Sequence, residues 1–191
     1  MTVALFEDFL EKTEKLAVHT SSTGGNTRID GVGGLMEIAS GGTSGQWRQL
    51  QSNNKIFEAK LSPVVTAFFR TKEATNLEVF VGLADTDAGS ANNAIGFYRV
   101  DTASAGNWKC RTKSGGTGTD VDTGFLGDTQ EVEMSFAVSP LEVTFVLNGR
   151  VIHVEKNNIP TAQLFLVVWI KTNTGAARTL VMDYVGIVSG R

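Results

Sequence analysis

The feature that most constrains the fold is Asn148-Gly149, which lies between the β-branched, apolar-rich runs "EVTFVL" and "RVIHVE". Asn and Gly accept the positive φ angles of a type I′ turn, whose twist matches that of a two-residue β-hairpin. Directly before it, "EVEMSFAVS" (131–139) alternates apolar and polar residues, as a half-buried strand does. The sequence therefore predicts three consecutive strands in the second half of the chain.

The rest of the chain repeats this pattern less regularly. Apolar or alternating runs are separated by turn-forming strings such as "SGGTSG", "DTDAGSANN" and "SGGTGTD". Near the end, "QLFLVVWIK" (163–171) is apolar on both faces, which fits a central strand covered on both sides or a contact between subunits. A strand is favoured over a helix at 4–9 because "FEDF" alternates. The other strands expected in the first half cover 35–39, 47–51, 56–61, 64–70, 78–84, 94–100 and 107–113.

About a dozen short strands without a convincing helix predict an all-β fold, an antiparallel two-sheet β-sandwich of the jelly-roll type. A length of 191 residues fits one domain. We expect residues 1–26 to form an N-terminal arm or first strand and residues 27–191 to form the sandwich domain.

Composition narrows the range of partners. The net charge is -3, the sequence pI is about 5.4, and Lys and Arg are scattered, so neither nucleic acid nor an acidic membrane surface is an expected partner. Acidic residues interrupt the apolar N-terminal stretch, and no apolar run approaches the roughly 20 residues that span a bilayer. The single cysteine, Cys110, excludes an internal disulfide and suits synthesis in a reducing cytoplasm.

The string "DTDAGSANN" is the one candidate metal loop, through Asp85 and Asp87. Counted from Asp85, a calcium loop of the EF-hand type would need an oxygen ligand at position 5, Gly at 6 and Glu at 12, where the chain has Gly89, Ser90 and Gly96. We therefore expect both aspartates to bond the backbone of their own turn, as Asx residues do. The sequence predicts no metal site and no cofactor. The alternative is a calcium ion that Asp85 and Asp87 hold with help from a neighbouring loop, as in legume-type lectins.

No catalytic constellation is visible in the sequence. Jelly-roll glycosidases carry alternating acids on one strand, whereas Glu131 and Glu133 are followed by Ser135 and read as the solvated face of a strand. His153 has no partner motif, and Cys110 is most simply a core residue. The glycine-rich strings lack the strand–helix context of phosphate loops. The sequence predicts a protein that is not an enzyme.

Aromatic residues leave sugar binding open. Trp47, Trp108 and Tyr98 are candidates for a platform on which a sugar stacks, because Trp47 and Trp108 stand between polar neighbours. Trp169 lies inside an apolar run and is expected in the core.

The order of several motifs resembles a known family. "VFVGLADTD", "IGFYRVD", "NWKCRTKSGGTGTDVDTG", the hairpin on "LNG", "NNIP" and "LVMDYVGIVSGR" follow one another through residues 79–191. This succession is similar to tailed-bacteriophage virion proteins with a concanavalin A-like (laminin-G-like) jelly roll. The resemblance covers about residues 25–191.

The resemblance implies a capsid decoration protein that docks on the outside of the phage head and stabilises it. It implies the major capsid protein as partner and a virion location. From the two-sided apolar run 164–170, together with the local three-fold points of capsid lattices, we expect a homo-oligomer, and specifically a homotrimer. The alternatives are a carbohydrate-binding module, or a fibre or tail component with a lectin-like sandwich that binds glycans. A jelly-roll glycosidase is the third alternative.

Overall fold

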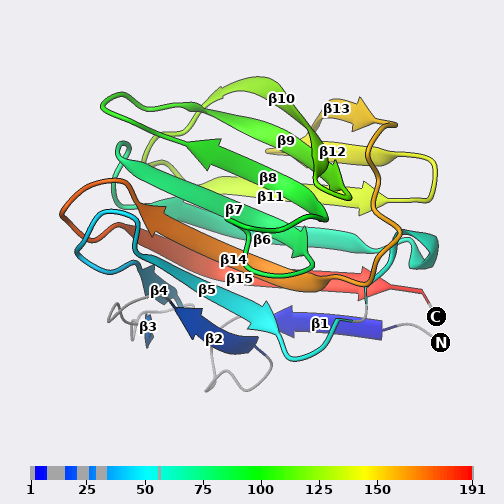
Figure 1. The fold of residues 1–191 in the computed structure, drawn as a ribbon, viewed down its shortest axis with the longest axis horizontal. Helices are drawn as coiled ribbons and strands as arrows, with labels where there is room; N and C mark the ends of the chain where they lie inside the picture. Colours follow the sequence, from blue (N-terminus) through cyan, green and yellow to red (C-terminus); the bar gives the residue numbers. More distant parts are fainter. Residues whose placement is uncertain (1–2, 8–15, 21–25, 29–33, 56, 191) are drawn as a thin grey trace.

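The computed structural model describes residues 3–7, 16–20, 26–28, 34–55 and 57–190, and it confirms the two-sheet antiparallel sandwich (Figure 1). Every pairing between neighbouring strands is antiparallel. Among the described residues there is no helix with the length and hydropathy needed to cross a bilayer.

One sheet has eight described strands, in the order β13 (Arg150–Glu155), β12 (Val143–Leu147), β11 (Val132–Val138), β6 (Val64–Thr71), β15 (Thr179–Ser189), β4 (Met36–Ala39) and β3 (Asn26–Arg28), with β1 (Val3–Glu7) also paired to β15. The other sheet has seven, in the order β10 (Thr117–Leu126), β9 (Asn107–Ser114), β8 (Ala94–Val100), β7 (Leu77–Ala84), β14 (Phe165–Thr172), β5 (Trp47–Ser52) and β2 (Leu16–Thr20).

The main core lies between the two sheets and follows from the alternation seen in the sequence. On β11, Val132, Met134, Phe136 and Val138 are buried, while the residues between them face solvent to different degrees. Phe136 packs against Phe145 with ring centroids 5.8 Å apart. Each large apolar side chain buried in this way contributes about 1.5–3 kcal/mol, so the alternation fixes which face of each strand turns inward.

The Asn-Gly hairpin is confirmed. Residues 148 and 149 alone separate β12 from β13, and both have positive φ angles, 48° at Asn148 and 74° at Gly149. The Asn148 side chain also accepts a hydrogen bond from the Glu133 N–H at 3.0 Å, and this bond connects the turn to the neighbouring strand β11.

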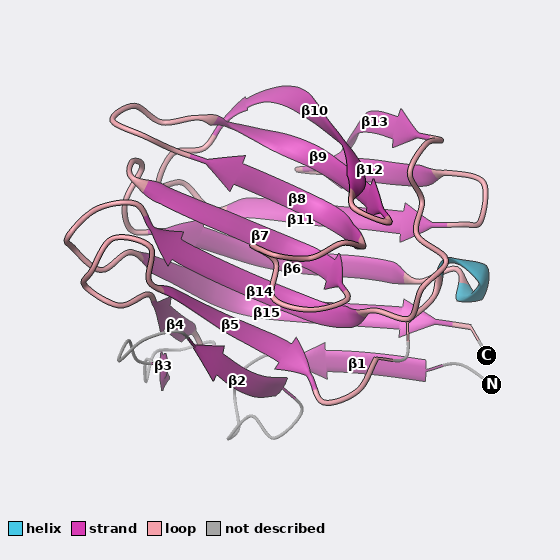
Figure 2. Ribbon diagram, in the orientation of Figure 1, coloured by secondary structure: helices cyan, strands magenta, loops and turns pink. Residues whose placement is uncertain are grey.

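The prediction of a strand at 56–61 is wrong. Phe57 makes only an isolated bridge to Leu164, and Ala59–Leu61 form a 3₁₀ helix, the single described helix in Figure 2. Ser62 ends this helix at φ 47° and its N–H donates to the Ala59 carbonyl. The local turn bonds replace strand pairing because Pro63 follows and has no N–H to offer to a sheet.

The string 114–120, expected to be a loop, is mostly a strand. Gly115 and Gly116, both at positive φ, make the whole turn, and β10 begins at Thr117. At the N-terminus, the strand expected at 4–9 is observed as β1, and positions 8 and 9 lie outside the described residues. β1 and β2 join different sheets, and the division at residue 26 stays a prediction.

Candidate functional site

The outer face of the seven-stranded sheet has an apolar centre. On β14, Leu166, Val168 and Ile170 belong to the main core, so Val167 and Trp169 point outward. Both outward residues are nevertheless at most 1% exposed. They belong to a smaller hydrophobic cluster outside the sheet, formed by Phe80, Ala84, Ala88, Ala91, Ala94, Val167 and Trp169.

The loop of residues 85–93 covers this cluster. Its Ala88 N–H donates to Gln49 Oε1 at 3.0 Å, and the Lys113 ammonium donates to the Ala91 carbonyl. Gly89 lies so close to the indole of Trp169 that an added Cβ would be 3.1 Å from Cζ2. Of the two interpretations of the apolar run 163–171, the structure therefore favours the covered central strand, and the run needs no second copy to bury it.

The two aspartates of this loop bond their own turn, as Asx residues are expected to do. Asp87 accepts hydrogen bonds from the Ser90 N–H at 3.1 Å and from the Ser90 hydroxyl. Asp85 accepts from the Asn92 N–H at 3.2 Å and from Asn93 Nδ2 at 2.7 Å. Among the described residues, no three His, Cys, Asp or Glu side chains gather as a metal-ligand group. The carboxylates therefore hold the loop in its own conformation.

A pocket opens beside this loop, with a volume of about 230 Å³. The alternation of "WRQLQ" places residues 47, 49 and 51 on the outer face of β5, and β14 brings Phe165 beside them. Loop 85–93 closes the pocket from the other side. Its walls are Trp47, Gln49, Gln51, Thr86, Asp87 and Phe165.

The two glutamines in the pocket form a directed hydrogen-bond chain. Gln49 Oε1 accepts the loop N–H of Ala88, and Gln49 Nε2 donates to Gln51 Oε1 at 2.7 Å. Gln49 is 1% exposed and Gln51 is 8% exposed, so both amides are fixed in orientation. This hydrogen-bond chain uses the Gln51 amide oxygen, so the Gln51 amide N–H groups remain as donors at the pocket wall.

These side chains combine aromatic surface with polar groups of both kinds. Trp47 is half-buried, and Phe165 lies under the Lys55 ammonium, 5.2 Å from the ring centroid. Asp87 has carboxylate oxygens that accept hydrogen bonds, and the Gln51 amide nitrogen carries N–H groups that can donate them. An apolar wall beside a few fixed donors and acceptors is how proteins bind a small polar ligand with a C–H face, such as a sugar ring.

Tyr98 lies on the same sheet face but is engaged by charged neighbours. Its hydroxyl donates to Glu78 at 3.0 Å, and Glu78 also accepts from Lys171 at 2.8 Å. The Arg111 guanidinium covers one face of the ring, 3.5 Å from its centroid, and pairs with Asp120. Burial, and after it the Glu78 carboxylate, raises the pKa of Tyr98. That ring face is closed to a sugar.

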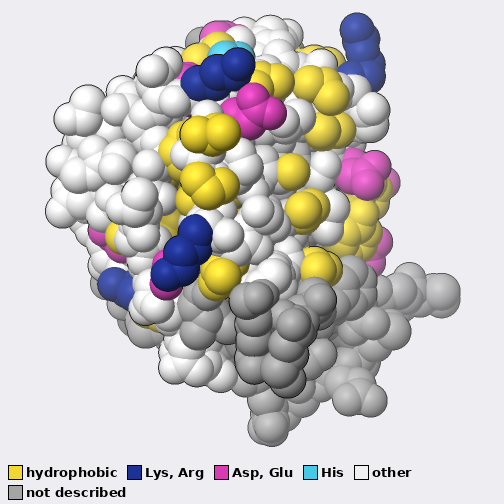
Figure 3. Space-filling view, turned by 90° about the vertical axis from the view of Figure 1, so that its right-hand side faces the viewer, with side chains coloured by type: hydrophobic (Ala, Val, Ile, Leu, Met, Phe, Trp, Pro, Cys, Tyr) yellow, Lys and Arg dark blue, Asp and Glu magenta, His cyan; other side chains and the backbone are white. Residues whose placement is uncertain are grey.

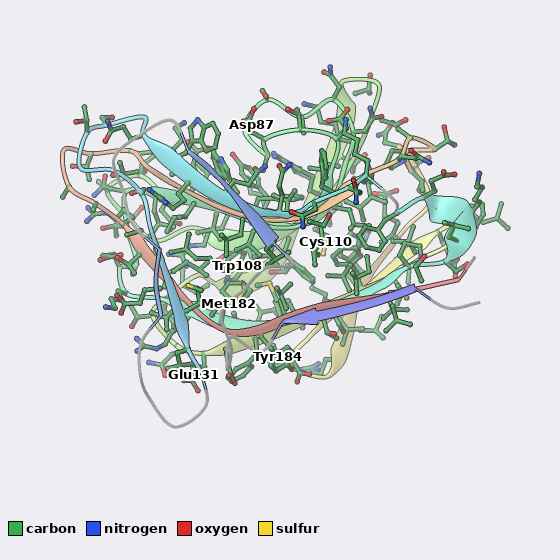
Figure 4. All side chains as sticks on the ribbon, turned by 90° about the horizontal axis from the view of Figure 1, so that it is seen from below. Asp87, Trp108, Cys110, Glu131, Met182 and Tyr184 are labelled. Atoms are coloured by element: carbon green, nitrogen blue, oxygen red, sulfur yellow. The ribbon has the colours of Figure 1, made fainter. Side chains whose placement is uncertain are left out.

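Trp108 is wrong as a sugar-stacking candidate. It is 4% exposed and packs edge-on against Phe69, with ring centroids 5.6 Å apart. The strand alternation of β9 puts it inside with Cys110, whatever its polar sequence neighbours. Figure 4 shows Trp108 and Cys110 between the sheets, whereas Asp87 lies outside the seven-stranded sheet.

The structure places the remaining sequence candidates in the core or on the surface of the sandwich, as follows. Cys110 is a buried core residue, as expected, and burial raises the pKa of its thiol to about 12. His153 stacks on Phe145, with ring centroids 6.3 Å apart, and lies 3.4 Å from Glu155. Glu131 and Glu133 are exposed, as the alternation predicted. Trp169 is buried as expected, although under the loop rather than between the sheets.

No family model and no curated protein sequence matches the chain. Solved structures match it in fold. A protein of unknown function from Shewanella oneidensis MR-1 is similar at 12% identity and a TM-score of 0.74, over 98% of this chain and 86% of that one. A prokaryotic β-1,3-1,4-glucanase (lichenase) from a mouse hindgut metagenome is similar at 10% identity and a TM-score of 0.72, over 98% of both chains.

A phage module has the same architecture. The CBM2 module of the evolved Dit of Lactobacillus casei BL23 phage J-1 is similar at 10% identity and a TM-score of 0.64, over 98% of this chain and 95% of that one. At such identities the likeness shows the fold alone. The chain therefore has the concanavalin A-like jelly roll that its motifs implied.

Proposed function

We propose that this protein is a carbohydrate-binding β-sandwich whose ligand occupies the pocket between β5, β14 and loop 85–93. The observation that carries the proposal is the joining of an aromatic wall, Trp47 and Phe165, to buried and fixed amides, Gln49 and Gln51. The fold neighbours that include glucanases and a carbohydrate-binding module support it.

We propose binding without catalysis. A retaining glycosidase needs two carboxyl groups about 5–5.5 Å apart across the scissile bond. On the outward positions of β5, β7, β8 and β14, Glu78 is the single carboxylate among the described residues, and Lys171 and Tyr98 already bond it. Among the described residues that line the pocket, Asp87 is the single carboxylate, and the Ser90 N–H and hydroxyl already bond it. This arrangement supports binding of a ligand rather than acid–base work.

A glycan array that includes bacterial cell-wall polysaccharides tests this function. We expect saturable binding to a subset of glycans, and Trp47→Ala to weaken it about tenfold or more through loss of the stacking wall. Gln51→Leu should weaken it as well, because the pocket loses its fixed donors. Leu141→Ser is the matched control, since Leu141 is 80% exposed and outside the pocket. Binding that Trp47→Ala leaves unchanged refutes the site.

Capsid decoration is the second candidate function, and one surface favours it. On the outer face of the eight-stranded sheet, the strand registers align Val188, Val64, Ala137, Thr144 and Val154 in one row across β15, β6, β11, β12 and β13. The three valines are 41–51% exposed. Such a row suits a protein partner, for which we propose the major capsid protein, with the chain as a homotrimer on the virion surface.

Hydrophobic side chains also gather at the end of the sandwich that Figure 3 faces. The pocket there, about 130 Å³, is lined by Ala59, Lys60, Pro140, Ile159 and Thr161.

The double variant Val64→Lys/Val188→Lys separates glycan binding from capsid decoration. If the protein is a decoration protein, the double variant loses co-sedimentation with expanded phage heads and keeps its glycan binding. Wild-type protein that binds no head at saturating concentration rules decoration out.

A further inference from the structure

A second pocket, unrelated to the proposed glycan site, opens where the chain passes from one sheet to the other. Residues 127–131 connect β10 of the seven-stranded sheet to β11 of the eight-stranded sheet. A pocket of about 150 Å³ lies between this connection and the Asn-Gly hairpin.

The floor of this pocket is apolar. Trp108, Val132 and Leu147 line it, and each is less than 10% exposed. Phe125 is part of the wall, and Leu126 stands at the lip with 58% of its surface in solvent. An exposed leucine beside a preformed apolar pocket is surface that a ligand would remove from water.

The rim of the pocket is acidic. Asp128 and Glu131 line it together with the amides of Gln130 and Asn148. Asp128 Oδ1 accepts the Gln130 N–H at 2.8 Å, and no described Lys or Arg forms an ion pair with Asp128 or Glu131. Glu131 also borders a smaller hollow lined by Arg70 and Asp183, whose opposite charges offset each other.

The cation beneath the pocket is already neutralised. Arg99 is fully buried, and its guanidinium lies 5.4 Å from the Trp108 ring and 2.5 Å from the Asp101 carboxylate. Arg99 therefore adds no net positive charge, and the rim keeps an excess of negative charge.

We propose that this pocket binds the side chain of a lysine or arginine presented by a protein partner. Its aliphatic stem would lie on the floor of Trp108, Val132 and Leu147, and its charged end would reach the rim carboxylates of Asp128 and Glu131. The apolar floor disfavours a hydrated metal ion. Trp108 is 4% exposed, a surface that a narrow methylene stem can contact but that is too small for a sugar ring to stack on. An uncharged apolar group would leave the two carboxylates unused.

The pocket is held in shape before any ligand arrives. Arg99 donates to the Asp128 carbonyl at 3.3 Å and to the Ala74 carbonyl at 3.0 Å. Gly127 makes this possible, because an added Cβ would be 2.2 Å from Arg99 Cδ. One buried guanidinium thus fixes the connection of residues 127–131 against a neighbouring loop. Binding of a ligand therefore requires little further ordering of the chain, and the entropy cost of binding is small.

NMR titration with N-acetyl-lysine methylamide tests the proposal on the full chain. We expect a saturable, millimolar shift of the Trp108 indole N–H resonance, while those of Trp47 and Trp169 stay in place. N-acetyl-norleucine methylamide has a similar stem without the charge, and it should bind at least threefold more weakly. An arginine probe is expected to behave like the lysine probe.

Asp128→Asn/Glu131→Gln is the test variant. Asp122→Asn is its control, because Asp122 lies on the neighbouring strand β10 and does not line the pocket. Both rim carboxylates are exposed, so the variant should fold, and its thermal unfolding confirms this. We expect the double variant to raise the dissociation constant threefold to tenfold and the control to leave it unchanged. Equal binding of the lysine and norleucine probes, or no Trp108 shift at 50 mM probe, overturns the proposal.

Discussion

Replacing Asp101 by Asn should destabilise this protein far more than breaking an ion pair nearer its surface. Arg99 and Asp101 are both fully buried and meet at 2.5 Å. Asp101 also accepts the Gly106 N–H at 2.5 Å, and an Asn Oδ1 can still do so. Asp101→Asn therefore removes the negative charge and replaces Oδ2, the acceptor that two Arg99 nitrogens contact, by an NH2 donor. It leaves the Arg99 guanidinium buried without a counter-charge.

The expected loss follows from that burial. Removing one partner of a buried pair costs about 3–5 kcal/mol, which is a large share of the roughly 5–15 kcal/mol that holds a typical domain folded. For a chain of this length each kcal/mol shifts the melting temperature by about 2–4 °C. We therefore expect Asp101→Asn to melt about 6–20 °C below the wild type.

The matched control is Asp120→Asn. Arg111 and Asp120 form a bidentate pair with two 2.7 Å contacts, but their side chains are 19% and 33% exposed. A solvent-exposed pair contributes about 0–1 kcal/mol. The buried pair has the poorer geometry of the two, since both Arg99 nitrogens contact one oxygen of Asp101. A larger loss for Asp101→Asn would therefore come from burial and not from better hydrogen-bond geometry.

Urea unfolding at constant pH is the assay, with the double variant Arg99→Met/Asp101→Asn closing the cycle. The double variant should lose at least about 2 kcal/mol less than the sum of the single variants, because each single variant leaves one buried charge unpaired and the double variant leaves none. Equal losses for Asp101→Asn and Asp120→Asn, within about 0.5 kcal/mol, would refute the reasoning.

Three further predictions follow from single contacts. Gly82→Ala should cost about 1–3 kcal/mol by denaturant unfolding, because the new Cβ would be 2.2 Å from the Ile95 carbonyl oxygen; Gly42→Ala, with nothing within 4 Å, is the control. Burial works against the Glu155 carboxylate, but the N–H groups of Asn157 and Lys156 lower its pKa below the usual 4.5. Its contribution to stability is therefore complete above about pH 5 and is lost as the pH falls through the lowered value, so Glu155→Gln should flatten the acid side of a Tm–pH curve; an unchanged slope would contradict this. EDTA should leave the melting temperature within about 1 °C, because the loop aspartates bond their own turn; a drop that calcium reverses would show a metal site.

Sequence periodicity predicted most strands because each sheet has one face against the main core. The alternation of 131–138 and the Asn148-Gly149 turn reappear in the structure with their expected faces and φ angles. The failures have local causes. At 59–61 a 3₁₀ turn before Pro63 replaced a strand, and at 117–126 a strand rich in Gly, Thr and Asp carries too few apolar residues to be recognised.

The candidate site was predictable only in part. Trp47 was identified from its polar neighbours, but the same argument wrongly selected Trp108. The local sequence shows only which residues are adjacent along the strand. The orientation of the strand in the sheet decides whether a given side chain faces the core. The alternation of 47, 49 and 51 would have added both glutamines, had the outer face of β5 been known to border a pocket.

By itself the sequence determined the all-β class, the hairpin, the inward faces of the best-alternating strands and the loop role of Asp85 and Asp87, because these depend on contacts between near neighbours. Only the tertiary structure decided what the two-sided apolar run of 163–171 packs against. Loop 85–93, some 80 residues away in sequence, folds over Trp169 and at the same time walls the pocket beside Trp47. Burial on the second face of a sheet depends on which distant segment covers it, and no local pattern carries that information.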